Sequence, residues 1–191
     1  MIRRGLIMNG DNSQRSIDIR TATVNDVKAI EVLIQESFAK IGRDHYSIRQ
    51  IHKAVSELGR IDEKLLSDGT LYVATSGRDI VGCGGWSRRR NLLSHANGIN
   101  PGGDMMFAHK DAAVLRLFFV RPGYSRQGIA TRLFRKCRAE VESNGFLRLE
   151  VLASAPGRAA AYRFGFCEAS EVQLQFDDGS HFVSHHMTLR I

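Results

Sequence analysis

The stretch SRQGIA, residues 125–130, has the residue types of an anion-binding site. It follows an apolar run and a proline turn, and it precedes a pattern typical of a helix. The first amides of a helix have no intrahelical acceptor, and the helix dipole adds positive potential there. The small residues Gly128 and Ala130 would let a bulky pyrophosphate approach the backbone, and Arg126 adds positive charge. The segment therefore predicts a site for a pyrophosphate group.

The apolar run just before this segment narrows the ligand. Residues 114–120 are nearly all apolar, which predicts a strand buried on both faces. The end of such a strand can offer unpaired backbone groups to an extended ligand that carries amides. A ligand with both a pyrophosphate and a peptide-like arm is coenzyme A. A Walker loop is absent, and only G-x-A stands where a dinucleotide fingerprint has three glycines.

The elements that must position this site follow from apolar periodicity and turn residues. A helix after Thr23 carries apolar residues at helical spacing, and Asn144-Gly145 ends the helix that follows the anion segment. We expect strands at about 17–20, 70–75, 80–86, 114–120, 146–152, 171–176 and 181–189, and helices at about 24–38, 47–58, 127–143 and from Pro156. This order predicts a mixed α/β domain with an antiparallel meander, a βαβ crossover and a C-terminal hairpin.

Size and composition place the chain among ordinary globular proteins. Its 191 residues suit one domain, which we expect over residues 17–191 after a flexible extension at residues 1–16. Three cysteines without a CxxC motif indicate reduced thiols, so we expect a cytoplasmic protein. No stretch approaches the roughly 18 apolar residues of a membrane span, so no membrane partner is expected.

The net charge of +7 is compatible with nucleic acid or a phosphorylated small ligand, although a solvated arginine-rich surface is the simpler interpretation. Outside Arg88-Arg89-Arg90 the basic residues are scattered, and no basic helix carries interleaved aromatics, so the sequence argues against nucleic acid. His181 and His185 share a face of the last strand, an arrangement that resembles two ligands of one metal ion. Without a neighbouring cysteine or acidic set we expect no metal.

Four stretches together resemble the GNAT superfamily of acetyl-CoA-dependent N-acetyltransferases. LRLFFVRPGYSRQGIATRLF is similar to its CoA-binding motif, and LRLEVLASAPGRAAAYRFGF to the strand and helix that follow. IDIRTATVNDVKAIEVLIQESF resembles its first strand and helix, and DGTLYVATSGRDIVGCGGWSRR its second and third strands. The resemblance covers residues 17–190. It implies an α/β (α+β) fold in which a mixed, splayed sheet of about six to seven strands is flanked by about four helices, with acetyl-CoA in a V-shaped cleft.

The resemblance also assigns roles in cofactor binding. The backbone of the strand end would line the pantetheine arm, the loop and helix start would wrap the pyrophosphate, and a serine stands where many members have an asparagine near the pantetheine. These residues are Phe118, Phe119 and Val120; Arg126, Gln127, Gly128, Ile129, Ala130 and Thr131; and Ser154. Ser125 departs from the arginine or glutamine usual at its position.

The implied reaction moves an acetyl group from acetyl-CoA to a primary amine of a small molecule or peptide, by direct attack in a ternary complex. A lysine-like amine with a pKa of ~10.4 is almost wholly protonated at neutral pH, so a general base helps. Glu150 is the best candidate, since its apolar neighbours Leu149 and Val151 indicate that it points the other way; the competing interpretation is an ordinary ion pair with a nearby arginine. Asp111 and Asp104 are weaker candidates. The alternative function is a catalytically inactive acetyl-CoA sensor or regulatory module.

The general acid is less clear from the sequence. Many GNAT members carry a tyrosine four residues before the glycine of the Gly-Phe pair, but Ala161 stands there and Tyr162 follows it. Either the helix is locally one residue shorter and Tyr162 reaches the cleft, or the enzyme works without this acid. A third interpretation is that Tyr162 packs at the rim.

The acceptor itself is not identified by the sequence, and a homodimer is left open. Residues 91–110 have no clean period, and we expect this loop to shape the acceptor pocket, the competing interpretation being a passive insertion. Arg88 and Arg90 share a face and would hold an acceptor carboxylate if they reach the pocket, although a solvated strand end is the simpler interpretation.

Overall fold

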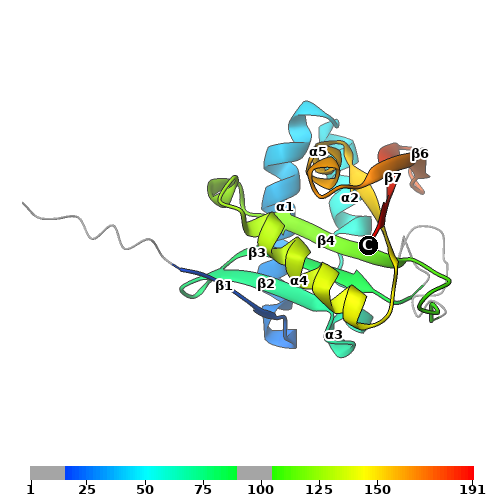
Figure 1. Cartoon of the computed structure of the whole chain (residues 1–191). Coiled ribbons are helices and arrows are strands. Elements are labelled where there is room, and N and C mark those ends of the chain that lie inside the picture. The colour runs from blue at the N-terminus through cyan, green and yellow to red at the C-terminus, as the bar shows by residue number, and fades with distance from the viewer. Residues whose placement is uncertain (1–15, 90–104) are drawn as a thin grey trace, which may run out of the picture.

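Among the described residues, seven strands form one mixed sheet in the order β1-β2-β3-β4-β5-β7-β6 (Figure 1). The computed structural model describes residues 16–89 and 105–191. The strands are β1 (Ile17–Thr21), β2 (Leu71–Ser76), β3 (Asp79–Ser87), β4 (Ala113–Val120), β5 (Arg148–Ser154), β6 (Cys167–Gln175) and β7 (His181–Arg190). All neighbouring strands are antiparallel except β4 and β5, which are parallel and joined by a crossover through a helix. This confirms the expected meander, βαβ unit and C-terminal hairpin.

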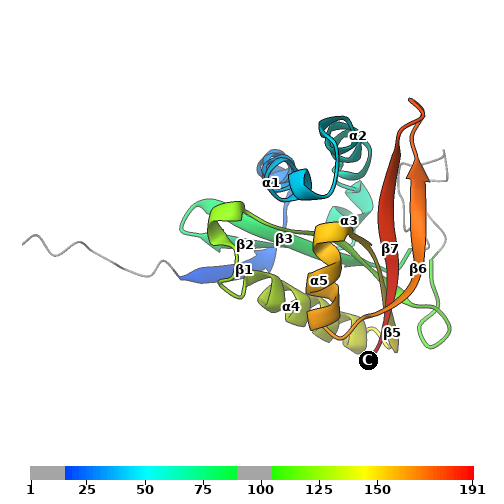
Figure 2. The same cartoon turned by 90° about the horizontal axis from the view of Figure 1, so that it is seen from above.

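In the described part of the chain, five α-helices cover the two faces of the sheet. They are α1 (Val27–Ile41), α2 (Ile48–Leu58), α3 (Glu63–Ser67), α4 (Ile129–Ser143) and α5 (Ala155–Arg163). Helices α1 and α2 lie on one face, and α4 lies on the other (Figure 2). Helix α3 was not expected from the sequence, because five residues are too few for a helical period. Asp62 begins it by accepting a hydrogen bond from the Lys64 amide at 2.8 Å.

Local signals account well for the helix starts. Ser47 caps α2 by accepting from the Gln50 amide, and the Gln50 side-chain oxygen accepts from the Ser47 amide, which completes a capping box. Thr23 and Asp26 form a second box before α1. Helix α4 begins at Ile129, two residues later than expected, because residues 126–128 form the curled loop described below.

The sheet divides between β4 and β5. Their parallel ladder joins only residues 113–115 to residues 149–151. Beyond that point the two strands diverge, and β6 and β7 run away from the plane of β1–β3 (Figure 2). The expectation that residues 114–120 are buried on both faces is therefore wrong for the second half of the strand. Residues 113–115 are buried, while residues 116–120 are partly exposed because they line the opening.

Two hydrophobic cores hold the halves together. The first, called the α4-side core, packs α4 and α5 against the sheet and contains Trp86, Leu133, Cys137 and Phe166. The second, called the α1-side core, packs α1, α2 and α3 against the opposite face and contains Ile30, Leu65 and Phe182. Cys137 is fully buried, as its place on the apolar helix face predicted.

Several sequence expectations concern residues outside the described part of the chain. These are nearly all of the expected N-terminal extension, residues 91–104 of the long loop, and the side chains of Arg90 and Asp104. Within residues 16–89 and 105–191, no helix is long and apolar enough to cross a membrane.

Candidate active site

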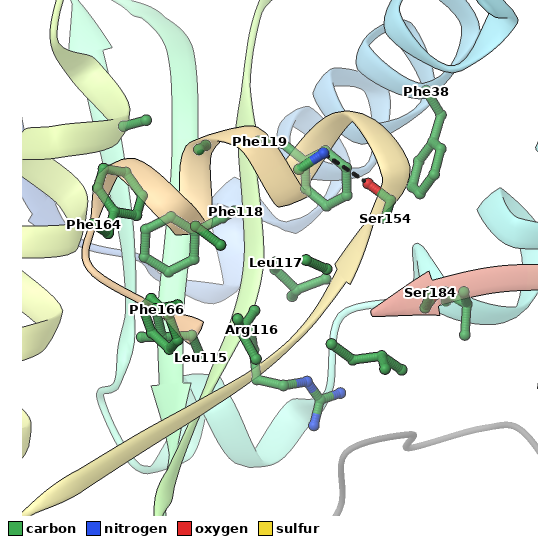
Figure 3. Close-up of a pocket in the computed structure, with 18 of the residues that line it drawn as sticks. Phe38, Leu115, Arg116, Leu117, Phe118, Phe119, Ser154, Phe164, Phe166 and Ser184 are labelled. Carbon is green, nitrogen blue, oxygen red and sulfur yellow. Dashed lines mark hydrogen bonds between the residues drawn. The ribbon is translucent and has the colours of Figure 1, made fainter. Parts of the chain in front are cut away.

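The divergence of β4 and β5 opens a cleft that extends from the start of α4 to the inner side of β7 (Figure 3). One half is lined by the end of β4, the start of α4 and one side of α5. The other half reaches Leu58 on α2, Leu152 on β5 and Phe182 and Ser184 on β7. Both halves share residues 118–120 and Ser154.

A β-bulge shapes the β4 wall of this cleft. Cys83 pairs with Phe119 and Gly85 pairs with Arg116, so three steps along β4 oppose two along β3. Leu117 takes up the extra residue with a left-handed φ of 56°, and its carbonyl accepts a bond from the Cys83 thiol at 3.1 Å. Phe118 and Phe119 then pack into opposite cores. The β4 edge facing β5 has no ladder partner beyond Leu115 among the described strands, so backbone groups are available to a ligand.

The loop before α4 curls into an open cradle. Arg126 and Gly128 have left-handed φ values of 63° and 77°, and Gly128 is the N-cap of α4. A β-carbon built on Gly128 would meet no atom within 4 Å, so the space above this backbone is open. Helix bonding begins where the Arg132 amide donates to the Gly128 carbonyl at 3.0 Å. The preceding amides of the helix, at residues 129–131, therefore have no intrahelical acceptor.

The residues expected to bind the cofactor come together in this cleft, with one exception. Phe118, Phe119, Val120, Arg126, Gly128, Ile129, Ala130, Thr131 and Ser154 all line it. Gln127 is exposed beside the loop and is not among the lining residues. The wall opposite the loop comes from α5, where Gly157 and Ala160 leave room and Arg163 adds a second positive charge.

Ser154 lies at the junction of β5 and α5. Its hydroxyl caps α5 by accepting from the Gly157 amide at 3.4 Å, so part of its capacity serves the protein itself (Figure 3). Next to it, the buried Tyr46 hydroxyl accepts from the Ala155 amide at 2.7 Å and donates to the Val183 carbonyl at 2.9 Å. This bridge ties β5 to β7 and fixes the start of α5.

Ala161 lines the cleft, and Tyr162 does not. Helix α5 runs without interruption from Ala155 to Arg163, so the locally shorter helix considered from the sequence is not present. The Tyr162 side chain is 46% exposed, and its hydroxyl donates to the Glu168 carboxylate at 2.7 Å. The Tyr162 hydroxyl as general acid has no geometric support in this arrangement.

Glu150 does point away from Leu149 and Val151, as expected. It lies beside the cleft, on the same face of β5 as the lining residue Leu152, but it does not itself line the described opening. One carboxylate oxygen is 3.3 Å from Nε2 of His186, which pairs across the sheet with Leu152. His186 could not be selected from the sequence alone, because its position opposite Leu152 depends on the β5–β7 register.

Arg116 is the other residue that sequence analysis missed. It is the last residue before the bulge at Leu117 and lines the half of the cleft that reaches β7 (Figure 3). Burial lowers the pKa of its guanidinium, against an opposing effect of the Asp62 carboxylate. The available signal was a single arginine inside an otherwise apolar strand, since such a charge must face a partner or a cleft.

With this geometry established, the comparison with protein families is decisive. The model of the acetyltransferase (GNAT) family matches residues 31–166 of the sequence. The chain belongs to the acetyltransferase (GNAT) family. The family and the splayed fold expected from the four sequence stretches are thus confirmed.

Solved GNAT structures have the same fold. The PaiA N-acetyltransferase from Thermoplasma acidophilum, in complex with coenzyme A, is 17% identical with a TM-score of 0.64, covering 92% of this chain and 99% of that one. A GNAT family acetyltransferase from Brucella melitensis, in complex with acetyl-CoA, is 17% identical with a TM-score of 0.58, covering 93% and 89%. The mosquito arylalkylamine N-acetyltransferase like 5b is 14% identical with a TM-score of 0.57, covering 92% and 100%. The curated proteins give no match to this sequence.

The remaining candidate residues of this GNAT chain lie away from the cleft. Arg88 stacks over the Trp86 ring with its guanidinium carbon 5.4 Å from the centroid. The Asp111 carboxylate accepts from the Phe107 amide at 2.8 Å. His185 is 2.8 Å from the Glu168 carboxylate, and the described residues contain no group of three side chains suited to a metal.

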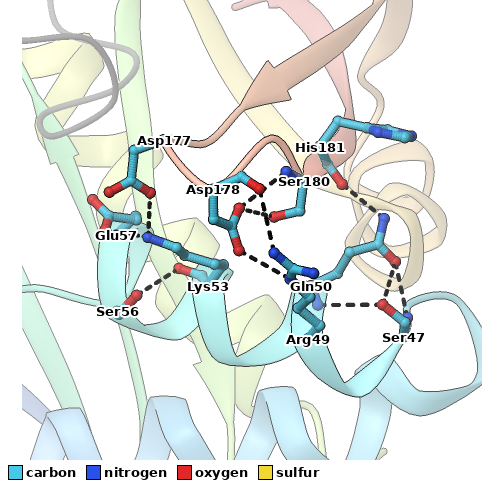
Figure 4. A network of polar contacts seen from close by, with 10 residues as sticks. All are labelled: Ser47, Arg49, Gln50, Lys53, Ser56, Glu57, Asp177, Asp178, Ser180 and His181. Carbon is cyan, nitrogen blue, oxygen red and sulfur yellow. Dashed lines mark hydrogen bonds and ion pairs between the residues drawn. The ribbon is translucent and has the colours of Figure 1, made fainter.

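A polar network joins α2 to the β6–β7 hairpin, beside the half of the cleft that reaches β7 (Figure 4). Gln50 on α2 donates to the His181 carbonyl at 2.7 Å, and the Arg49 Nε donates to Asp178 at 3.1 Å. Lys53 contacts both Asp177 and Glu57. These bonds attach the β6–β7 hairpin to α2, so the two elements that supply Leu58 and Phe182 to the cleft are held together.

Proposed function

We propose that this chain transfers the acetyl group of acetyl-CoA to a primary amine, by direct attack in a ternary complex. The observation that carries the proposal is the continuous cleft between β4 and β5. Its α4 end has the helix amides and positive charge that suit a pyrophosphate. Its other end opens between α2 and β7, which leaves room for a second substrate to reach the acyl group.

The cradle fits the cofactor by shape as well as by charge. The space above the Gly128 backbone is open, and the small side chains of Ala130, Gly157 and Ala160 leave room for a ligand between α4 and α5. We assign the pyrophosphate to residues 126–131 and the pantetheine arm to residues 118–120, where β4 has no ladder partner on the β5 side. Because the Ser154 hydroxyl already caps α5, it has less capacity for the pantetheine than the asparagine common in the family.

In the reaction the amine loses one proton, and the sulfur atom of coenzyme A takes up the negative charge when the thioester bond breaks. The neutral amine attacks the thioester carbonyl, a tetrahedral intermediate forms, and the C–S bond breaks to release the coenzyme A thiolate. Glu150 is the proposed base, with His186 beside it at 3.3 Å; a water between Glu150 and the amine would bridge its distance from the cleft. A thiol with a pKa near about 8.5 leaves acceptably without an acid.

One observation keeps a second function in view. The cleft presents Ala161 where a proton donor would stand, so an acetyl-CoA-binding regulatory module without turnover is the alternative. Both functions require acetyl-CoA binding, and they differ only in product formation.

The test is an acceptor panel of amino acids, aliphatic and aromatic amines, polyamines and short peptides. Each is incubated with the protein and acetyl-CoA, and the release of free thiol is compared with the mass of the acetylated product. An acetylated amine confirms the proposal. Tight acetyl-CoA binding without any acetylated product supports the regulatory module, and absence of acetyl-CoA binding contradicts both.

A further inference from the structure

The half of the cleft that reaches Leu58, Leu152, Phe182 and Ser184 is called the acceptor half, and it is apolar except for a few groups. Leu58, Leu117, Leu152 and Phe182 supply hydrocarbon surface. Among the described lining residues the charged side chains are Glu57 and Arg116. Glu57 lies at the rim with Lys53 at 3.5 Å, whereas Arg116 projects from the strand that forms the cleft wall (Figure 3). An acceptor entering this half would therefore meet apolar surface and one enclosed guanidinium.

Arg116 lies at the end of the cleft where the acceptor would react. It lies in the middle of β4, directly before the bulge residue Leu117, whereas residues 126–131 follow the C-terminal end of that strand. A group held by its guanidinium is consequently separated from the pyrophosphate end and close to the pantetheine edge at residues 118–120. This distinguishes Arg116 from Arg126 and Arg163, which line the α4 end of the cleft.

The chemistry of the guanidinium points to a carboxylate. Five N–H donors in a planar fork allow arginine to bind a carboxylate with two parallel bonds in addition to contacts with the protein itself. Burial lowers the pKa of Arg116, so its charge is incompletely solvated, and an incoming anion would offset that cost. Asp62 already balances part of the charge, which suits a monoanion better than a phosphate. The described lining residues of this half offer no second cation for a dianion.

We infer that the acceptor amine carries a carboxylate on an apolar body, and that Arg116 recognises this carboxylate. The inference rests on the proposed function. Amino acids with apolar side chains have this chemistry, and so do apolar ω-amino acids. Arg116 is then a specificity-determining residue, because it selects the acceptor without taking part in proton transfer.

The experiment compares acceptors that differ only in the carboxylate. Phenylalanine is paired with phenethylamine, and leucine with isopentylamine. Phenylalaninamide keeps the α-amine and removes the charge, and an ω-amino acid tests the spacing between the two groups. We expect kcat/KM to be at least about tenfold higher for the carboxylated member of each pair. This preference should fall close to unity in Arg116→Gln and Arg116→Met, mainly through KM, and Arg116→Lys should keep part of it.

Two controls separate recognition from folding and from the general activity. Arg138→Gln removes an arginine whose exposed ion pair with Glu142 lies on α4, so the preference should stay intact. The acetyl-CoA dissociation constant and melting temperature of each Arg116 variant should match the wild type closely. The inference is overturned if the carboxylated and uncharged acceptors react equally in the wild type. It is also overturned if the Arg116 variants lose activity toward all amines in the same proportion. In both cases the acetyltransferase proposal stands. If no amine is acetylated, the proposed function itself fails.

Discussion

At the scale of single residues, Gly128 combines two features that explain its role. Its φ of 77° is one that residues with a β-carbon rarely adopt, and the space that a side chain would fill is open toward the cleft. The sequence predicted the second feature from the small residue type. It did not predict the first, because a left-handed N-cap depends on how the whole loop from residue 121 curls.

Gly128→Glu should abolish acetyl-CoA binding in a folded protein. The substitution places a carboxylate where the pyrophosphate is assigned, and we expect the dissociation constant to rise by about 100-fold or more, because like charges would be brought together. Binding is measured by calorimetry and by the rise in melting temperature with ligand. Gly77→Glu is the matched control, since Gly77 has a φ of 62° and equally open space in the β2–β3 turn. Equal ligand-induced stabilisation of both variants would contradict the assignment.

Tyr162→Phe should leave catalysis nearly unchanged. The hydroxyl donates to Glu168 and accepts from Arg158 outside the cleft, so its loss removes two exposed hydrogen bonds and no proton donor to the cleft. We expect kcat to remain within about twofold of the wild type between about pH 6 and about pH 9, where loss of a true general acid costs about 100-fold or more. Ala161→Tyr should instead raise kcat, because residue 161 lines the cleft. A large loss of kcat in Tyr162→Phe would show that α5 rearranges during turnover.

Glu150→Gln should slow the reaction without weakening acetyl-CoA binding. The amide cannot accept the amine's proton, so kcat/KM should fall by about 100-fold with a lysine-like acceptor. The loss should be smaller for an amine of lower pKa, which is more often neutral. Glu168→Gln is the control, since Glu168 contacts Tyr162 and His185 away from the cleft. An equal effect on acceptors of high and low pKa would argue against a role as base.

At the scale of elements, local patterns predicted most strands and helices, and long-range pairing explains the exceptions. An apolar run from 114 to 120 cannot reveal that its ladder with β5 stops at Leu115. The isolated Arg116 within that run was the one local indication that the strand lines an opening. His186 became a candidate only through its register opposite Leu152, since nothing in the sequence places those two residues together.

Asp26 links the end of β1 to the start of α1, and its removal should destabilise the fold. Arg20 donates two bonds to its carboxylate at 2.7 and 2.8 Å, and Thr23 adds bonds from its amide and hydroxyl. The Arg20 bonds in particular hold the pKa of Asp26 well below its usual value. We expect Asp26→Asn to cost about 1 to 2 kcal/mol near neutral pH, measured by urea unfolding.

The pH dependence of that cost distinguishes charge from packing. The folded state binds the Asp26 proton more weakly than the unfolded chain does, so the contribution is complete above the unfolded pKa of about 4. It decreases as the pH falls below that value toward the lower folded pKa. The difference in unfolding free energy between wild type and Asp26→Asn should therefore shrink in acid. A difference that stays constant with pH would indicate that the charge contributes nothing.

At the scale of the whole molecule, a single sheet divided by the divergence of β4 and β5 presents one continuous cleft. Each half of the sheet has neighbours that keep it rigid: α4 packs beneath β3 and β4, and the α2–hairpin network supports β7 (Figures 1 and 4). The cleft is consequently a feature of the strand order rather than of any one loop. This is why the fold could be expected from the sequence although the acceptor could not.

The net charge of +7 is the remaining property of the whole molecule that bears on its ligand. Coenzyme A carries several phosphate charges, so a basic protein should attract it over distances longer than a direct contact. Salt screens that attraction, with a Debye length of about 10 Å at 0.1 M. We expect the acetyl-CoA association rate to fall several-fold between about 0.05 and about 0.5 M NaCl, with a smaller change in the dissociation rate.

Two variants separate direct contact from long-range attraction. Arg163→Gln, in the cleft wall, should weaken both the affinity for acetyl-CoA and the salt dependence of that affinity. Arg138→Gln, on the outer face of α4, should reduce only the long-range attraction and so slow association slightly. Stopped-flow fluorescence with each variant measures these rates, and an association rate independent of salt would mean that the net charge has no part in capturing the cofactor.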